Sequence, residues 1–172
     1  MKKTIALMLV LCVFTSTIFL SGCNKISGND GLIDKARQEI NISNADTAEM
    51  QIIGSNKDGD NILIWFMSGN EYQAHTYLPI EFIDLGNDQY KFVKTYKPIK
   101  RGMDIYALIW NNKYCFMINN ESCKSLSLEI DNGNKELITV DCYPFIYMTD
   151  RPYATYNFEY YFLDKNGEPI YN

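Results

Sequence analysis

The chain has 172 residues, of which 47% are hydrophobic and 22% are charged, and this composition excludes collagen-like and intrinsically disordered classes. Its net charge of −5 argues against a nucleic-acid partner, because contacts to phosphates need clustered lysine and arginine. A single histidine excludes any site that is built from several imidazole groups.

The first 23 residues have the parts of a secretory signal in the expected order. A short basic start is followed by an apolar run over 4–20 and by small residues before Cys23. The sequence Leu20-Ser21-Gly22-Cys23 resembles the lipobox of bacterial lipoproteins. The resemblance implies cleavage between Gly22 and Cys23 and a diacylglycerol on Cys23, which anchors such proteins on the extracytoplasmic face of the cell membrane. An uncleaved anchor is the alternative, because about 17 apolar residues can just span a bilayer.

Cleavage at this position divides the chain into three parts. We expect a signal peptide over 1–22, a lipidated cysteine with a flexible polar tether over 23–30, and a single β-rich domain over 31–172. The mature chain has 150 residues and a net charge of −7, because two lysines leave with the signal. A chain of this length usually forms one domain.

One helix is predicted, over residues 31–42. Asp30 can cap its start, and apolar residues recur at helical spacing, namely Leu32, Ile33, Ala36 and Ile40. Charged residues occupy the opposite side, so we expect the helix to pack on a sheet through its apolar face.

The rest of the chain consists of short β-rich runs separated by turn signals. The runs cover residues 50–55, 61–68, 72–80, 90–96, 104–110, 113–119, 125–130, 136–148 and 156–163. Tight turns are predicted at Asp58-Gly59, Asn111-Asn112, Asn132-Gly133 and Asn166-Gly167. Strands joined by such short loops are antiparallel. The sequence therefore predicts a mainly β fold, an antiparallel β-sandwich or partly closed barrel of about eight or nine strands, with one short N-terminal helix.

A polar stretch contains the only histidine and three further candidate ligand-binding residues, Asn70, Glu71 and Gln73. On a strand, Glu71, Gln73 and His75 share one face. Glu71 and His75 would then lie about 13 Å apart, which is too far for a direct acid–base pair. Two interpretations remain open: an exposed polar strand face, or the lining of a polar ligand site.

Aromatic residues form two rows near the C-terminus. Alternation places Tyr143, Phe145 and Tyr147 on one strand face, and does the same for Tyr156, Phe158 and Tyr160. Such rows pair across strands to fill a core, which is the favoured interpretation. The alternative is a groove in which the aromatic rings stack on sugar rings.

Three cysteines remain beyond the signal and the lipidation site. An exported domain allows disulfides, and Cys115 and Cys123 flank a predicted turn, so a bridge between them is one predicted pairing. Three thiols allow three pairings, and each of them leaves one thiol over. The cysteine spacing does not favour zinc, and we expect no metal site and no cofactor.

A basic cluster contains Lys91, Lys94, Lys97, Lys100 and Arg101. These residues could meet anionic headgroups or wall polymers. Alternation sends them to different faces, however, and lysines also protect edge strands from aggregation. The edge-strand interpretation is favoured.

We therefore expect a membrane-anchored lipoprotein whose domain is a non-catalytic interaction module for an envelope protein. It would present an exposed apolar patch. One alternative is a small-ligand or glycan-binding module, which predicts a concave pocket. The other is a cryptic hydrolase, which predicts His75 or a thiol within hydrogen-bond reach of a carboxylate or serine. We expect no catalytic residue.

Overall fold

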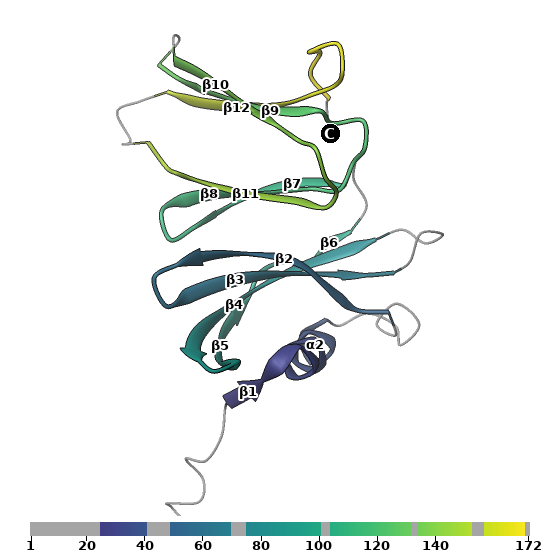
Figure 1. Cartoon of the computed structure of the whole chain (residues 1–172), viewed down its shortest axis with the longest axis vertical. Coiled ribbons are helices and arrows are strands. Elements are labelled where there is room, and N and C mark those ends of the chain that lie inside the picture. Colours follow the sequence, from purple (N-terminus) through teal and green to yellow (C-terminus); the bar gives the residue numbers. More distant parts are fainter. Residues whose placement is uncertain are drawn as a thin grey trace, which may run out of the picture.

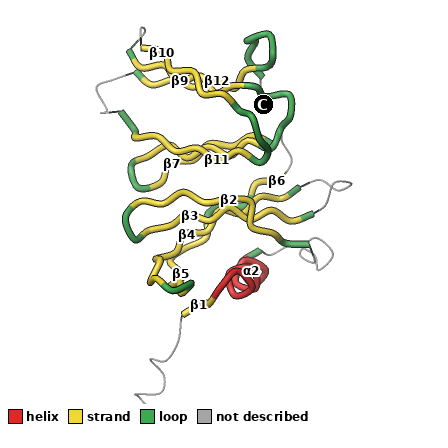
Figure 2. Tube along the Cα trace, in the orientation of Figure 1, coloured by secondary structure: helices red, strands yellow, loops and turns green. Residues whose placement is uncertain are grey.

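The computed structural model describes residues 25–40, 49–69, 75–100, 104–131, 134–152 and 157–170. This part of the chain is mainly β, with one helix and antiparallel strands in three sheets that do not close into a barrel. The helix and the sheets stack as four layers along the long axis of the molecule (Figures 1 and 2). The predicted mainly β class with one N-terminal helix is confirmed.

The first sheet, sheet A, lies against the helix. Its strand order is β1 (Lys25–Ser27), β5 (Gln89–Thr95), β4 (Thr76–Gly86), β3 (Asn61–Ser68) and β2 (Gln51–Asp58), and β6 (Ile99–Lys100) also pairs with β4. Helix α2 (Gly28–Glu39) covers one face of this sheet. The predicted turn at Asp58-Gly59 is a tight hairpin between β2 and β3, in which Gly59 has a φ of 60°.

The other two sheets have three strands each. Sheet B, the middle layer, has the order β11 (Phe145–Asp150), β8 (Lys113–Ile118) and β7 (Ile105–Trp110). Sheet C, the outer layer, has the order β10 (Asn134–Thr139), β9 (Ser125–Ile130) and β12 (Phe158–Leu163). The predicted turn between β7 and β8 is formed by Asn111 and Asn112, whose φ angles are 47° and 59°.

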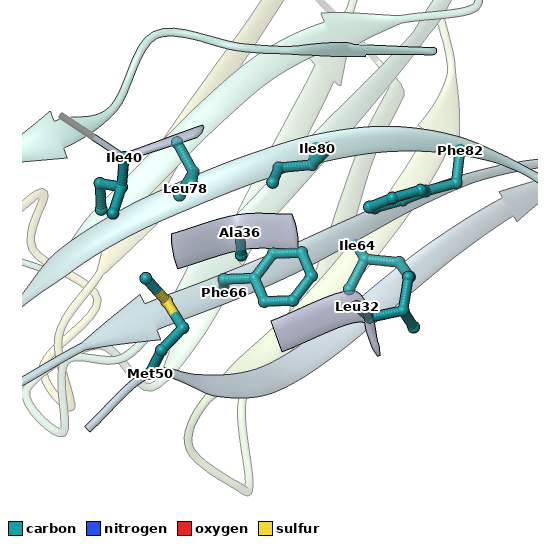
Figure 3. Close-up of a cluster of buried hydrophobic side chains, with 9 residues drawn as sticks. All are labelled: Leu32, Ala36, Ile40, Met50, Ile64, Phe66, Leu78, Ile80 and Phe82. Atoms are coloured by element: carbon teal, nitrogen blue, oxygen red, sulfur yellow. The ribbon is translucent and has the colours of Figure 1, made fainter. Parts of the chain in front are cut away.

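The helix contributes the first of three buried clusters. Figure 3 shows its apolar side chains pointing at sheet A, and the buried members are Leu32, Ala36, Ile40, Met50, Ile64, Phe66, Leu78, Ile80 and Phe82. The helical spacing of Leu32, Ala36 and Ile40 aligns them on one side of α2. The predicted packing of the helix on a sheet is therefore confirmed.

Strand β3 is buried on both faces. Ile64 and Phe66 pack under the helix, whereas Leu63, Trp65 and Met67 pack against sheet B. Strands that are covered on both sides read as continuous apolar runs rather than as alternating ones. The sequence Ile-Leu-Ile-Trp-Phe-Met over 62–67 has this form.

The prediction of a flexible tether is wrong for residues 25–30. Lys25–Ser27 pairs with β5, and the helix begins at Gly28 with Ser27 as its N-cap, three residues before the predicted start. A strand of three residues is too short to show alternation in a sequence, and its pairing partner lies more than sixty residues away.

Two strand boundaries also differ from the prediction. The run 136–148 is two strands, because the chain leaves sheet C after Thr139 and enters sheet B at Phe145. Pro144 immediately precedes the second strand, and proline has no N–H to donate to a ladder. Strand β4 continues to Gly86, well beyond the predicted end at residue 80, despite the charged Glu81 and Asp84.

The stacking of sheet A on sheet B depends on a glycine in β2. A Cβ atom added to Gly54 would lie 2.5 Å from Cγ1 of Ile146 in β11, closer than packed carbon atoms approach. We expect Gly54→Ala to lower the free energy of unfolding by about 1–3 kcal/mol, the usual range for overpacking. Chemical denaturation measures this difference.

A double-mutant cycle separates this contact from any other effect of the substitution. Ile146→Ala removes Cγ1, so Gly54→Ala should cost less in that background than in the natural one. If the two substitutions are additive within about 0.5 kcal/mol, the close approach does not limit the stacking.

Candidate functional site

A 330 Å³ pocket opens between sheets B and C. Its lining comes from the facing ends of four strands: Leu128, Ile130, Asn134, Lys135, Glu136, Thr149, Asp150 and Phe158. Three of these side chains are apolar and five are polar or charged. Its volume lies at the lower end of the range of small-ligand sites.

Phe158 connects this pocket to the aromatic core. Its ring stacks on Tyr114 of β8, with a centroid separation of 4.4 Å and an interplanar angle of 24°. Phe158 packs beside the buried cluster between the sheets, which includes Phe116, Leu126 and Phe162. Phe158 therefore belongs both to the core edge and to the pocket wall.

Tyr160 follows Phe158 on the same side of β12. Its ring meets Phe116 edge-on at 5.2 Å and lies 6.1 Å from Tyr114, measured between ring centroids. The side chain is still 38% exposed. Tyr160 does not line the 330 Å³ pocket, although its packing helps to fix the rings beside Phe158.

A second hollow of 610 Å³ adjoins the first, and the two share Asp150. Mostly polar residues from the β2–β3 and β7–β8 hairpin ends and from the end of β11 line it, namely Asp58, Asn111, Asn112, Lys113, Asp150, Arg151 and Pro152. The backbone N–H of Arg151 donates to the carbonyl of Asn112 at 3.1 Å, which joins the end of β11 to the β7–β8 turn. The two hollows meet at this one residue, the second on the sheet A side of β11 and the first on the sheet C side.

Lys113 is the central charge of the second hollow. Its ammonium group donates to Asp150 and lies 3.9 Å from the carboxylate of Asp58. The hydrogen bond to Asp150 raises the pKa of Lys113, so the side chain stays charged at any physiological pH. Paired charges of this kind offer donors and acceptors close together without a large net charge.

The lining of the two hollows is electrically balanced. Asp58, Glu136 and Asp150 are opposed by an equal number of basic residues, Lys113, Lys135 and Arg151. The whole chain, by contrast, carries a net charge of −5. This surface therefore favours a polar ligand without a strong charge over an ion.

His75 lies elsewhere, at the junction of sheets A and B. Its Nδ1 is 3.2 Å from the hydroxyl of Tyr77. That hydroxyl donates to Asp104 at 2.9 Å and accepts from the side-chain amide of Asn119 at 3.0 Å. Burial raises the pKa of Tyr77, which keeps its hydroxyl protonated as the donor to Asp104.

Several predicted site residues lie outside the described residues. They are Gly22, Cys23, Asn70, Glu71, Gln73 and Tyr156. Of the predicted ligand-site residues that are described, Phe158 lines a pocket, whereas His75 and Tyr160 do not line either hollow. The structure therefore does not bring His75 and Phe158 to one site.

The predicted disulfide between Cys115 and Cys123 is wrong. Residues 119–124 do not form a hairpin loop, because β8 and β9 belong to different sheets. Cys115 packs between sheets A and B, and Cys123 packs between sheets B and C, so the middle sheet separates them. Both are free thiols, and so is the exposed Cys142.

The part of the chain that the structure describes contains no cluster of three or more metal-ligating side chains and no helix long and apolar enough to cross a membrane. No protein-family model matches the chain, and no curated protein or solved structure matches it. The residues themselves must therefore support any functional assignment.

The thiols should differ sharply in reactivity. Burial raises the pKa of Cys115 to about 12 and also raises the pKa of Cys123, so neither forms a reactive thiolate near neutral pH. We expect iodoacetamide to modify Cys142 in the native protein and the two buried cysteines only after denaturation. Peptide mass spectrometry resolves the three sites. Recovery of a Cys115–Cys123 disulfide peptide under non-reducing conditions would contradict the structure.

Proposed function

We propose that the protein is a bacterial lipoprotein, anchored through a diacylglycerol on Cys23 to the extracytoplasmic face of the cell membrane. We also propose that its domain is a non-catalytic binding module for a small, neutral, polyhydroxylated ligand, such as a sugar unit of an envelope glycan. The observation that carries the second proposal is the pocket between sheets B and C with Phe158 in its wall.

The chemistry of the two hollows on either side of Asp150 supports this ligand class. Leu128, Ile130 and Phe158 give an apolar wall, against which the C–H face of a sugar ring can pack. Asn111, Asn112 and Lys113 then supply hydrogen-bonding groups in the adjoining hollow. A hydroxyl both donates and accepts, so it can be satisfied by a lysine and a carboxylate together.

The hypothesis of a protein-interaction module has less support. Among the described residues, the large exposed hydrophobic side chains are Leu85, Val93, Ile109, Leu137 and Tyr160, and these are distributed over all three sheets. Protein interfaces are recognised by contiguous patches rather than by scattered side chains.

The hypothesis of a hydrolase also has little support among the described residues. The two buried thiols have raised pKa values, which is the opposite of what a nucleophile needs. The hydroxyl of Tyr77 donates to Asp104, and this hydrogen bond links sheet A to the start of sheet B.

The lipid anchor can be tested by exchanging one cysteine at a time. In bacteria fed an alkyne-tagged fatty acid, Cys23→Ala should abolish labelling and leave an unprocessed precursor, because the modified residue is lost. Cys12→Ala removes the other N-terminal cysteine and serves as the matched control, which should stay labelled. Labelling that survives Cys23→Ala would rule out the proposed anchor.

The ligand site can be tested with two substitutions of the same type. Phe158→Leu removes the ring from the pocket wall, whereas Phe145→Leu removes a ring of the same buried cluster that does not line the pocket. Thermal unfolding is measured against a panel of neutral sugars and wall fragments. A ligand at about 100 times its dissociation constant stabilises the native state by roughly 2.7 kcal/mol.

We expect one or more panel members to stabilise the natural protein and the Phe145→Leu variant. Their apparent affinity for the Phe158→Leu variant should be at least tenfold weaker. Loss of binding in both variants would indicate a general packing defect. A panel with no stabilising member would contradict the proposed ligand class.

A further inference from the structure

The first strand lies very close to the proposed lipid anchor. Strand β1 begins at Lys25, two residues after Cys23, and each residue extends a chain by at most about 3.6 Å. The Cα atoms of Cys23 and Lys25 are therefore within about 7 Å of each other. Because β1 is paired with β5, the lipid is attached almost directly to the edge of sheet A. This step rests on the proposed function.

The chain enters the fold at one end of the molecule. Figure 1 shows β1, β5 and the turn between β4 and β5 at the lower end, with sheet C at the opposite end. A two-residue connection keeps this end of the domain within about 7 Å of the lipidated residue. The edge formed by β1 and β5 must therefore lie beside the lipid headgroups.

Two lysines face each other on this edge. Lys25 and Lys91 are directly opposite in the β1–β5 register, and both are exposed. Neither has an ion-pair partner among the described residues, although Lys94 in the same strand is paired with Glu81. Like charges directly opposite each other destabilise a strand pair. A negatively charged surface would remove that cost.

The lysine pair lies on the side of sheet A that faces away from the helix. Ile26 and Tyr90, their neighbours along the two strands, pack into the cluster under α2, and successive side chains of a strand point to opposite faces. On the helix side, Asp30 and Asp88 line a small hollow.

Exposed apolar side chains accompany the lysines. Leu85 in β4 is 44% exposed and Val93 in β5 is 41% exposed, and both lie where the register between these strands shifts. Lysines beside exposed apolar groups are the combination that binds the interface of an anionic bilayer. The mature domain carries a net charge of −7, so it is repelled by such a bilayer everywhere except at a basic surface.

We infer that the β1–β5 edge, with Lys25, Lys91, Leu85 and Val93, docks on the headgroups of anionic lipids and fixes the orientation of the domain on the membrane. The lipid chains hold the protein at the bilayer, and this membrane-facing edge decides which side meets it. Each lysine near an anionic bilayer strengthens binding about fivefold.

The orientation can be measured on the full-length lipidated protein. Purified protein carrying Cys142→Ser and a single new cysteine, either Val93→Cys or Leu137→Cys, is labelled with a fluorophore and placed in vesicles. Leu137 is 59% exposed on sheet C and serves as the distant reference. The vesicles contain phosphatidylcholine, with or without 30% phosphatidylglycerol, and a headgroup quencher.

We expect quenching at residue 93 to exceed quenching at residue 137 several-fold in the phosphatidylglycerol vesicles. The double variant Lys25→Glu, Lys91→Glu should remove most of that difference. The double variant Lys124→Glu, Lys165→Glu, which changes the net charge equally, should preserve it. Equal quenching at the two positions, or equal effects of the two double variants, would overturn the inference.

Mass spectrometry of the peptide that contains Cys23 separates this inference from the proposed anchor. Absence of the diacylglycerol on Cys23 would overturn both. A lipidated Cys23 with equal quenching at residues 93 and 137 would leave the anchor intact and overturn the docking of the edge alone.

Discussion

Both faces of the middle sheet pack against a neighbouring sheet, and the rest of the fold depends on that constraint. Cys115 and Met117 of β8 point into the cluster shared with sheet A, whereas Phe116 and Ile118 point into the cluster shared with sheet C. Three strands of six residues each are too small to be stable alone, so both neighbouring sheets are needed to bury these side chains. The helix then covers the remaining apolar face of sheet A.

Stacking of this kind fixes how polar groups must be placed where the chain passes from one sheet to the next. Asp104 immediately precedes β7, and its carboxylate accepts from Tyr77 of sheet A while its carbonyl accepts from the backbone of Asn119 at 2.7 Å. A buried hydroxyl left unpaired would cost about 1–3 kcal/mol, so this connection specifies one alignment of sheets A and B. The sole histidine contacts the same hydroxyl.

Local pattern was sufficient for most of the strands but not for their assembly into sheets. The runs 61–68 and 125–130 coincide with β3 and β9, and the asparagine pair at 111–112 forms its hairpin turn. A continuous apolar run does not say which sheet covers which face, so the separation of Cys115 from Cys123 was not visible. The pairing of β1 with β5 is likewise non-local, and nothing in three residues indicates it.

The candidate site shows the same division between what is local and what is assembled. Phe158 was recognisable because aromatic residues at alternating positions are a local signal. Asp58, Lys113 and Asp150 were not, since each sits at the end of a different strand and resembles an ordinary surface charge by itself. Their significance lies in neutralising one another beside an apolar wall. In an acidic protein, such a local balance reduces the general repulsion of anions and the attraction of cations, so a ligand of the proposed site would be selected by shape and hydrogen bonding.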